Sequence, residues 1–287
     1  MAKNIAASRQ KKPGGLSDKV SDIVLVVICA AVMLIVAYPL YYVLVASFSD
    51  PYDVYAGKTF LLPSQFTLKG YQAVFADSAL FSGFINSIKY TVIGTIYSVV
   101  MIYLVAYPLS VKDLPGRKYI SLFFVITMYF GGGLVPTYLI VKQTGLLGSM
   151  WALFLPGVVA VGNVIIVRNF FENNIPRELL EAAEIDGCSK AKTLIRVILP
   201  VSIPSLISTG LYAFINAWNE FMFGYVLISS DKLRTLTPAI MLFKGANLVD
   251  WGGLMAASVI SVLPVTIIFL FLQKYFLAGL MSGSVKG

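Results

Sequence analysis

The chain has 287 residues, of which 58% are hydrophobic and 13% are charged, and its formal net charge is +8. A soluble domain is nearer half apolar and a quarter charged, so this composition indicates an all-α polytopic membrane protein. The chain has no histidine, and its two cysteines show neither a disulfide framework nor metal spacing. No phosphate-binding GxxxxGK[S/T] loop occurs, so we do not expect this chain to hydrolyse ATP by the usual device. We also expect no catalytic residue, metal site or cofactor in this chain.

The first apolar run is typical of a transmembrane helix. Residues 1–22 form a basic arm, and the run 23–47 follows it. About 25 residues can span a hydrocarbon core of about 30 Å, and they are too many for the apolar part of a signal peptide. We therefore predict an uncleaved first span with a bend at Pro39.

Five further apolar runs bring the number of predicted spans to six. They cover residues 84–110, 119–141, 149–167, 201–228 and 255–277. The run 119–141 is interrupted by Gly131-Gly132-Gly133 and Pro136. Broken helices are tolerated where they line a cavity, and small residues also allow close helix packing. A flexible point in a translocation path and tight packing therefore both remain open.

Polar residues in these runs are candidates for a substrate pathway. They are Asn86, Asn163, Asn216, Trp218, Asn219 and Glu220. An acidic residue within a span is a functional hypothesis by default, which applies to Glu220. The alternative is a helix-end carboxylate for Glu220 and an interhelical hydrogen bond for Asn163. A short helix is expected at residues 236–243, in the loop after the fifth run.

The distribution of lysine and arginine predicts the orientation. Fifteen of the 22 lie in the N-terminal arm, the turn 112–118, the charged loop 168–200 and the C-terminal end. Six lie in the loops on the other side. The positive-inside rule therefore places both termini and the charged loop in the cytoplasm. Residues 23–287 then form a multi-pass domain in the cell (inner) membrane, in contact with lipid.

The loop 168–200 has the pattern of two helices joined by a turn outside the membrane. Pro176 suits the first turn of a helix, and acidic residues follow where the helix dipole favours them. Gly187 stands where the first helix would end, because glycine adopts the left-handed conformation freely. Ser189 can cap the second helix. Leu179, Leu180 and Ala183 make the first helix partly apolar, so we expect it to dock on something.

This loop resembles the EAA loop of binding-protein-dependent ABC importer permeases. Glu181-Ala182-Ala183 is followed after three residues by Gly187 and after nine more by Val197-Ile198-Leu199-Pro200. One departure is Val197, where the family usually has isoleucine. The resemblance implies a cytoplasmic coupling helix that sits in a cleft of an ATPase subunit. The implied coupling residues are Glu181, Ala182, Ala183, Asp186, Gly187, Leu199 and Pro200.

Other stretches are similar to carbohydrate-importer permeases of the maltose-transporter type. They are Trp218–Glu220 and the ranges 236–240, 250–270 and 279–287. This resemblance implies the fold of type I ABC importer permeases, with a paralogous permease as partner. It also implies two ATPase subunits that bind ATP and magnesium, an extracytoplasmic binding protein and a sugar substrate, without nucleic acid. The passage GGGLVPTYL at 131–139 is more similar to permeases for complex oligosaccharides and uronic-acid polymers.

Two other classes of function make different predictions. An ion-coupled secondary transporter would carry ionisable residues deep inside its spans, whereas Lys89 and Glu220 lie near the ends of theirs. A membrane-embedded enzyme acting on glycans or lipids would need clustered carboxylates or histidines. The sequence has no such cluster beyond the charged loop, so it favours a permease subunit that is not an enzyme.

Overall fold

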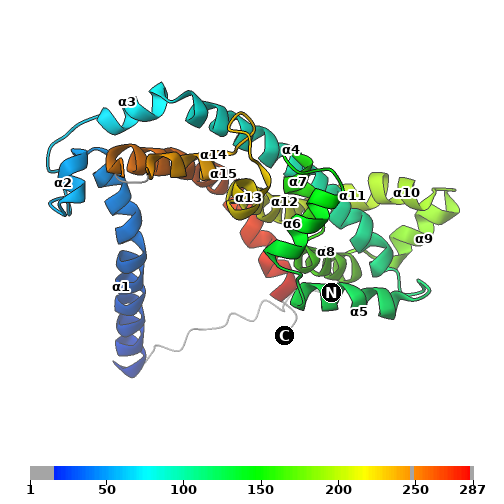
Figure 1. Ribbon diagram of the computed structural model, residues 1–287. Coiled ribbons are helices and arrows are strands. Elements are labelled where there is room, and N and C mark those ends of the chain that lie inside the picture. Colours follow the sequence, from blue (N-terminus) through cyan, green and yellow to red (C-terminus); the bar gives the residue numbers. More distant parts are fainter. Residues whose placement is uncertain (1–15, 246–248, 285–287) are drawn as a thin grey trace.

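The structure is a computed structural model that describes residues 16–245 and 249–284. Within these ranges every regular element is a helix, apart from two isolated bridges, and this confirms the all-α prediction (Figure 1). By length and composition, three helices can cross a membrane, and three bent helix pairs raise that number to six. Most of the predicted arm 1–22 and the last three residues of the predicted C-terminal motif lie outside the described residues.

The first two spans begin earlier than hydropathy predicts. Helix α1 (Leu16–Ser47) starts before residue 23, and α4 (Ser78–Ser110) starts before residue 84. The start of α4 is set by Asp77, whose carboxylate accepts hydrogen bonds from the backbone N–H groups of Ala79 and Leu80 at 2.8 and 3.2 Å. A polar N-cap therefore fixes this helix end in place of the edge of the apolar run.

Two short helices connect α1 to α4. They are α2 (Pro51–Tyr55) and α3 (Lys69–Ala76). Helix α3 packs on the last long helix, α15 (Trp251–Ser284), and the contact joins Gly70 to Gly252. A Cβ atom on Gly70 would lie 2.3 Å from the carbonyl oxygen of Gly252, so only glycine permits this backbone approach.

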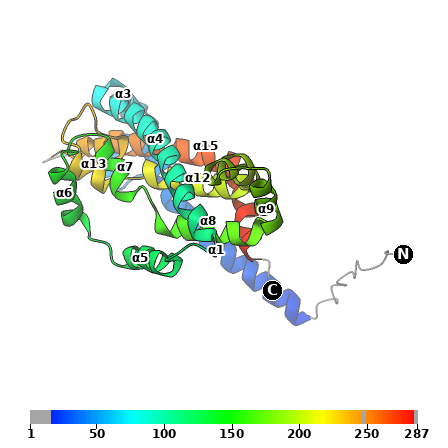
Figure 2. The same ribbon diagram turned by 90° about the vertical axis from the view of Figure 1, so that its right-hand side faces the viewer.

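The third predicted span is sharply bent. Helices α5 (Arg117–Tyr129) and α6 (Leu134–Gln143) meet at 114° and point in different directions (Figure 2). The break falls on the predicted glycines, and Gly133 has a positive φ of 82°. Pro136 lies in the first turn of α6 and does not interrupt it, because a proline there displaces no helical hydrogen bond.

The fourth predicted span is also bent and is longer than predicted. It consists of α7 (Trp151–Phe154), the 3₁₀ turn η1 (Leu155–Gly157) and α8 (Val161–Asn174), with a bend of 56°. Helix α8 continues beyond residue 167 into the charged loop. The loop is therefore joined to the helical body by a rigid element.

The fifth predicted span, 201–228, is divided in the structure. Helix α12 (Ile203–Trp218) ends before α13 (Met222–Leu227) begins. At the break, the Glu220 carboxylate accepts the N–H of Phe223 at 2.9 Å, which satisfies a free N–H group in the first turn of α13. The predicted helix at 236–243 is confirmed as α14 (Leu236–Ile240) and the 3₁₀ turn η3 (Met241–Phe243).

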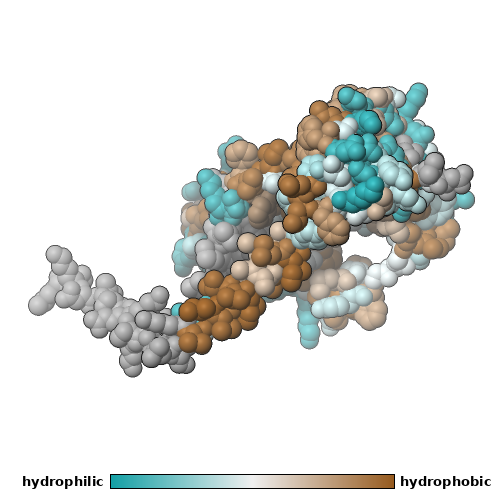
Figure 3. All heavy atoms as spheres, turned by 90° about the vertical axis from the view of Figure 1, so that its left-hand side faces the viewer, coloured by the Kyte–Doolittle hydropathy of each residue, from teal (hydrophilic) through white to brown (hydrophobic). Residues whose placement is uncertain are grey.

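The helices bury three apolar clusters, but α1 stands outside them. The largest lies between α4, α8 and the end of the charged loop, and a second joins α3, α4, α12, α14 and α15. A third, smaller cluster includes residues of α6, α7 and α13. The membrane-length part of α1 buries none of its most apolar window within the chain, and Figure 3 shows a mostly hydrophobic surface along it.

Candidate coupling loop and translocation surface

The charged loop folds into a helical hairpin at one end of the molecule. Its first helix, α9 (Arg177–Ile185), follows Pro176, and its second, α10 (Lys190–Thr193), follows Ser189. Figure 1 places α9 and α10 far from α2 and α3. The Ser189 hydroxyl accepts the N–H of Lys192 at 3.4 Å, which is the predicted cap.

The turn between the two helices depends on Gly187. Its φ is +72°, a value that side chains with a Cβ rarely adopt. The N–H of Gly187 bonds the carbonyl of Glu184 at 3.0 Å, and the N–H of Cys188 bonds that of Ala183 at 2.9 Å. This pair of bonds is the Schellman motif, which satisfies carbonyls at a helix end and reverses the chain. The direction of α10 is thus fixed by local chemistry.

The two faces of α9 differ. Ala183 is buried, and Leu179 and Leu180 pack against the cluster that α4 and α8 form. Glu181, Ala182, Asp186 and the adjoining Ile185 are exposed, and Ile185 is 86% exposed. This face therefore presents two carboxylates and one large apolar side chain to the surroundings. Of the two alanines, Ala183 faces its own chain and Ala182 faces outwards.

The second half of the loop returns the chain to the spans through an unusual turn. A π-helical segment, η2 (Leu194–Ile198), leads into α11 (Leu199–Val201). The N–H of Leu199 reaches back to the carbonyl of Leu194, which is the wider spacing of a π-helix. Pro200, which has no N–H, follows directly and is exposed, whereas Leu199 is half-buried.

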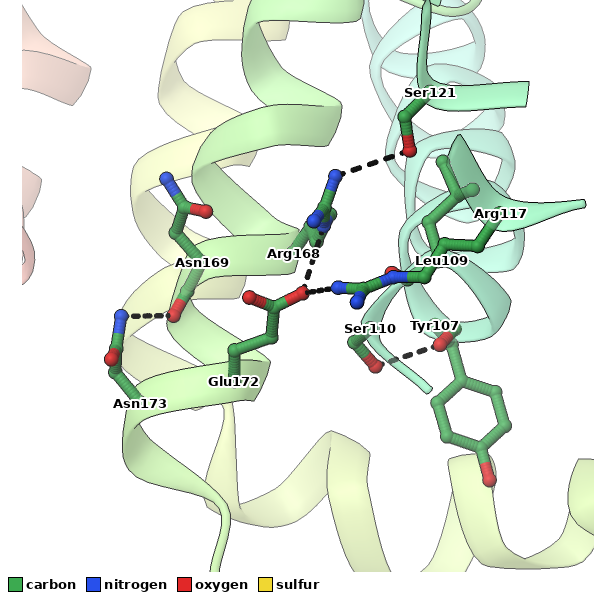
Figure 4. Close-up of polar contacts among 9 residues, drawn as sticks. All are labelled: Tyr107, Leu109, Ser110, Arg117, Ser121, Arg168, Asn169, Glu172 and Asn173. Carbon is green, nitrogen blue, oxygen red and sulfur yellow. Dashed lines mark hydrogen bonds and ion pairs between the residues drawn. The ribbon is translucent and has the colours of Figure 1, made fainter. Parts of the chain in front are cut away.

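Two arginines and one glutamate anchor the base of the loop. Glu172, near the end of α8, pairs with Arg117 at the start of α5, and its Oε1 lies 2.8 Å from the Nε of Arg168 (Figure 4). The three side chains are only 21%, 24% and 26% exposed, so solvent screens them less than a surface pair. Arg117 also donates to the carbonyl of Leu109 at 2.7 Å. The cluster therefore joins α4, α5 and α8.

A cavity of about 310 Å³ separates this base from the hairpin. It lies between the end of α4 and α9, and its lining includes Glu181, Glu184 and Lys190. Glu184 and Lys190 also pair at 3.3 Å, but both are more than 70% exposed, so this pair contributes little stability. Glu181 therefore lies on the wall of this cavity and is exposed.

Among the pathway candidates, Asn86 and Trp218 have contacts within the chain. The buried Asn86 amide donates to the carbonyls of Lys232 and Arg234 at 2.8 and 3.1 Å. The Trp218 indole is also buried and donates to the carbonyl of Ser261 at 2.9 Å. Both side chains therefore hold the loop after α13 and helix α15 in place.

The other pathway candidates are more accessible. Asn216 and Asn219 are exposed at the end of α12, and Asn163 is half-buried in the first turn of α8. Glu220 is half-buried and accepts the N–H of Phe223, as described above. The structure thus brings Asn216, Asn219 and Glu220 together around the break after α12, and it places Asn163 on a different helix. No cluster of three potential metal ligands occurs among the described residues.

Sequence reasoning did not single out Glu172 or Arg117 as functional residues. The spacing of four residues between Arg168 and Glu172 on one helix is a recognisable signal for an ion pair. Arg117, however, is 55 residues from Glu172, and only the fold brings them together. Ser87, which accepts the N–H of Leu236 at 2.8 Å, was missed for the same reason.

Comparison with known proteins gives a consistent result. Residues 78–281 match the family model of the binding-protein-dependent transport system inner membrane component. The chain is 35% identical over 269 residues to the polygalacturonan/rhamnogalacturonan transport system permease protein YtcP of Bacillus subtilis, covering 88% of this chain and 94% of that protein. It is 35% identical over 280 residues to the trehalose/maltose transport system permease protein MalG of Thermococcus litoralis, covering 95% and 100%.

Solved structures are similar over almost the whole chain. One chain of a bacterial ABC transporter involved in the import of the acidic polysaccharide alginate superposes with a TM-score of 0.82 at 29% identity. The match covers 92% of this chain and 99% of that one. A chain of the alginate transporter in complex with a pentasaccharide-bound periplasmic protein has a TM-score of 0.60 at 14% identity, a likeness of fold alone.

Proposed function

Because the chain belongs to the binding-protein-dependent inner membrane transport family, we propose that it forms part of the pathway of an ATP-driven oligosaccharide importer. It is a carbohydrate ABC permease and a multi-pass membrane protein. A permease subunit is itself no enzyme, and we assign ATP hydrolysis, with its ATP and magnesium, to two cytoplasmic partner subunits. The alternative of an ion-coupled transporter has no support from the family.

The observation that carries the proposal is the exposed face of α9. The hairpin projects Glu181 and Ile185 from one end of a rigid unit made by α8, α9 and the arginine–glutamate cluster. Movement of an ATPase dimer against this face would be transmitted to α8 and α4, since the cluster and the apolar packing connect them. The spans could then open to one side of the membrane at a time.

The proposed orientation places the hairpin in the cytoplasm. The basic residues on its side of the molecule support this through the positive-inside rule. The same orientation puts α2, α3 and the loop after α13 outside, where a solute-binding protein would dock. A second, paralogous permease would cover the apolar surface of α1, which the described part of this chain leaves exposed.

We propose acidic oligosaccharides as the substrate class. One relative named for polygalacturonan/rhamnogalacturonan transport, and a similar structure named for alginate import, support a substrate that contains uronic acids. The accessible pathway candidates near the end of α12 are Asn216, Asn219 and Glu220, which lie around the break after that helix. Asn163 is the candidate on α8.

The coupling face can be tested with a charge reversal. In the complete importer, Glu181→Lys should abolish or strongly weaken copurification of the ATPase subunits, because truncating one member of a docked charge pair costs about 2–5 kcal/mol. The matched control is Asp22→Lys, an equal charge change at an exposed residue of α1 that lines neither the hairpin nor the cavity beside Glu181. Normal ATPase binding and normal uptake by Glu181→Lys would refute the coupling role.

The substrate class needs a separate experiment. Proteoliposomes with the complete importer, its binding protein and internal ATP should take up a labelled oligogalacturonide, and unlabelled oligogalacturonide should compete. Maltotriose of the same concentration is the neutral control and should not compete. Equal competition by maltotriose would contradict the acidic-substrate proposal but would leave the importer assignment standing.

The orientation can be tested by labelling. In a background with Cys29→Ser and Cys188→Ser, a cysteine at Ser189 should react with an impermeant thiol reagent only from the cytoplasmic side. A cysteine at Ser64, which is exposed in the loop between α2 and α3, should react only from outside. The reverse labelling pattern would overturn the proposed topology.

A further inference from the structure

A second cavity lies on the other side of the arginine–glutamate cluster. Its volume is about 580 Å³, and it opens at the start of α5. It is lined by Lys112, Leu114, Gly116, Arg117, Lys118, Tyr119, Ser121 and Arg168. The turn between α4 and α5 contributes most of this lining, and α8 contributes Arg168. We refer to this cavity as the basic pocket.

The charge balance of the basic pocket is one-sided. Four of its described lining residues are cationic, and none is a carboxylate. Two carboxylates lie near the basic pocket: Asp113 follows Lys112 in the sequence, and Glu172 pairs with both arginines. Both of them line the smaller cavity under α9. Only Glu172 offsets part of the charge, through its two arginine pairs. The pocket therefore has a net positive potential that an anion would lower.

The two arginines and the two lysines differ in how they are held. Arg117 and Arg168 are fixed by Glu172, by the Leu109 carbonyl and by the Ser121 hydroxyl (Figure 4). Lys112 and Lys118 are exposed, and within the described part of the chain neither side-chain ammonium group forms an ion pair. The arginines form a fixed wall, whereas the lysines are free to close on a ligand.

The pocket adjoins an exposed apolar surface on α5. None of the residues of this helix is buried. Large apolar side chains begin next to Lys118 and continue along the helix: Tyr119, Ile120, Leu122, Phe123, Ile126, Met128 and Tyr129. A cationic pocket beside an apolar helix surface matches the two ends of a phospholipid, an anionic headgroup and acyl chains.

We propose that the basic pocket binds the phosphate of an anionic phospholipid, whose acyl chains lie along α5. The proposed orientation would place this lipid in the cytoplasmic leaflet. Binding of the lipid itself does not depend on that orientation. Phosphatidylglycerol fits the charge balance better than phosphatidylcholine, because the pocket offers no carboxylate for a quaternary ammonium group. Arg168 lies on α8, the helix that enters the coupling hairpin, so the lipid contacts the base of the coupling unit.

The test compares lipid retention by the purified full-length chain in detergent, measured by native mass spectrometry. The probes are phosphatidylglycerol and phosphatidylcholine with identical acyl chains. The test variant is Lys112→Gln/Lys118→Gln, which leaves the arginines and Glu172 intact. The control variant is Lys142→Gln/Lys244→Gln, the same charge change at exposed lysines outside the pocket.

Wild type and the control variant should retain phosphatidylglycerol in preference to phosphatidylcholine. The test variant should lose about fivefold of this affinity per lysine, since a basic residue near an anionic surface contributes about 1 kcal/mol. Unchanged retention by the test variant would overturn the proposal. Because neither ATP nor sugar is present, this result is independent of whether the importer assignment holds.

Two other outcomes would also overturn the lipid assignment. Inorganic phosphate at millimolar concentration should not displace phosphatidylglycerol; complete displacement would show that the pocket takes a free phosphate. Retention should also persist in the complex with the ATPase subunits. Loss of the lipid only on complex assembly would identify the pocket as a protein-docking surface.

Discussion

Helices α1 and α4 are 32 and 33 residues long and both are strongly apolar, yet the chain uses them differently. In the most apolar window of α4, 28% of the residues are buried, against none in that of α1. The buried side of α4 carries small and polar residues, among them Gly83, Asn86, Ser87, Thr91 and Gly94. Residues 23–37 of α1 contain no glycine, serine, threonine or asparagine, and their small residues are Cys29, Ala30, Ala31 and Ala37.

This difference shows what hydropathy does and does not predict. Lipid and another helix are equally apolar environments, so helix contacts depend on close packing and hydrogen bonds between helices. A span with small and polar residues on one side is therefore expected to pack within its own chain. A span of large apolar residues, such as α1, is suited to lipid or to a partner subunit. Matched substitutions in the two helices test this contrast.

The largest expected difference is between two leucines. Leu80 in α4 is 1% exposed, and Leu34 in α1 is 66% exposed. Leu80→Ala should destabilise the chain by about 2–5 kcal/mol, because it leaves a cavity in the cluster with Trp218 and Leu236. Leu34→Ala should leave thermal unfolding of the isolated chain in detergent almost unchanged. Equal losses of melting temperature would refute the contrast.

Enlarging a side chain should also destabilise the chain more in α4 than in α1. A Cβ atom on Gly83 would lie 3.2 Å from the Cβ of Ala239 and 3.3 Å from the Cα of Leu236. Gly83→Leu should therefore cost about 1–3 kcal/mol through overpacking. Ala31→Leu adds a side chain on the exposed surface of α1 and serves as control. Fluorescence-detected size-exclusion melting of both variants checks the prediction, which fails if Gly83→Leu melts like wild type.

A smaller effect is expected from a single hydrogen bond of α4. Ser87 is buried, and its hydroxyl accepts the Leu236 N–H at 2.8 Å. Ser87→Ala leaves that N–H unpaired and should cost about 1 kcal/mol. Ser82 contacts the Lys232 carbonyl at 3.4 Å on the surface, so Ser82→Ala is the control with little effect. Faster proteolysis of the 229–237 loop in Ser87→Ala alone is the expected readout.

The smallest effect concerns the end of α1. Asp50 caps α2, and the hydrogen bond from the Tyr52 N–H, aided by Lys69, holds the pKa of its carboxyl below the ordinary value of 3.8. A lowered folded pKa means that the cap stabilises the junction at neutral pH and is lost as the pH falls below about 4. Asp50→Ala should therefore increase proteolysis between α1 and α2 at pH 7, and this increase should become smaller as the pH falls through the lowered pKa of Asp50. An increase that keeps the same size while the pH is lowered until the carboxyl is protonated would contradict this account.

Local signals made the hairpin predictable. Pro176, Gly187 and Ser189 each act within a few residues of their own position, and the structure places them at the start, turn and cap that the sequence indicates. The break at Gly133 was predictable for the same reason. The coupling roles of Glu181 and its neighbours remain predictions, since they depend on a partner protein.

Contacts between distant residues could not be predicted in this way. Trp218 is compatible with a substrate pathway and with packing, and only its bond to Ser261, 43 residues away, shows the packing contact. The break after Trp218 was missed because apolar residues resume at Phe221 and continue to Ile228, so Asn219 and Glu220 were counted within one apolar run. The carboxylate of Glu220, three residues before the N–H that it accepts, is a capping signal that could have indicated the break.

The π-helical segment η2 also sets the rotational phase between the hairpin and the spans. An α-helix advances about 100° per residue, so each residue added or removed turns everything beyond it by that angle. Residues 194–198 contain the wider turn, and α12 then follows at a bend of 89° to the segment Lys190–Val201. Deleting one of these residues would leave helices α9 and α10 unchanged. It would, however, rotate the exposed face of α9 relative to α12.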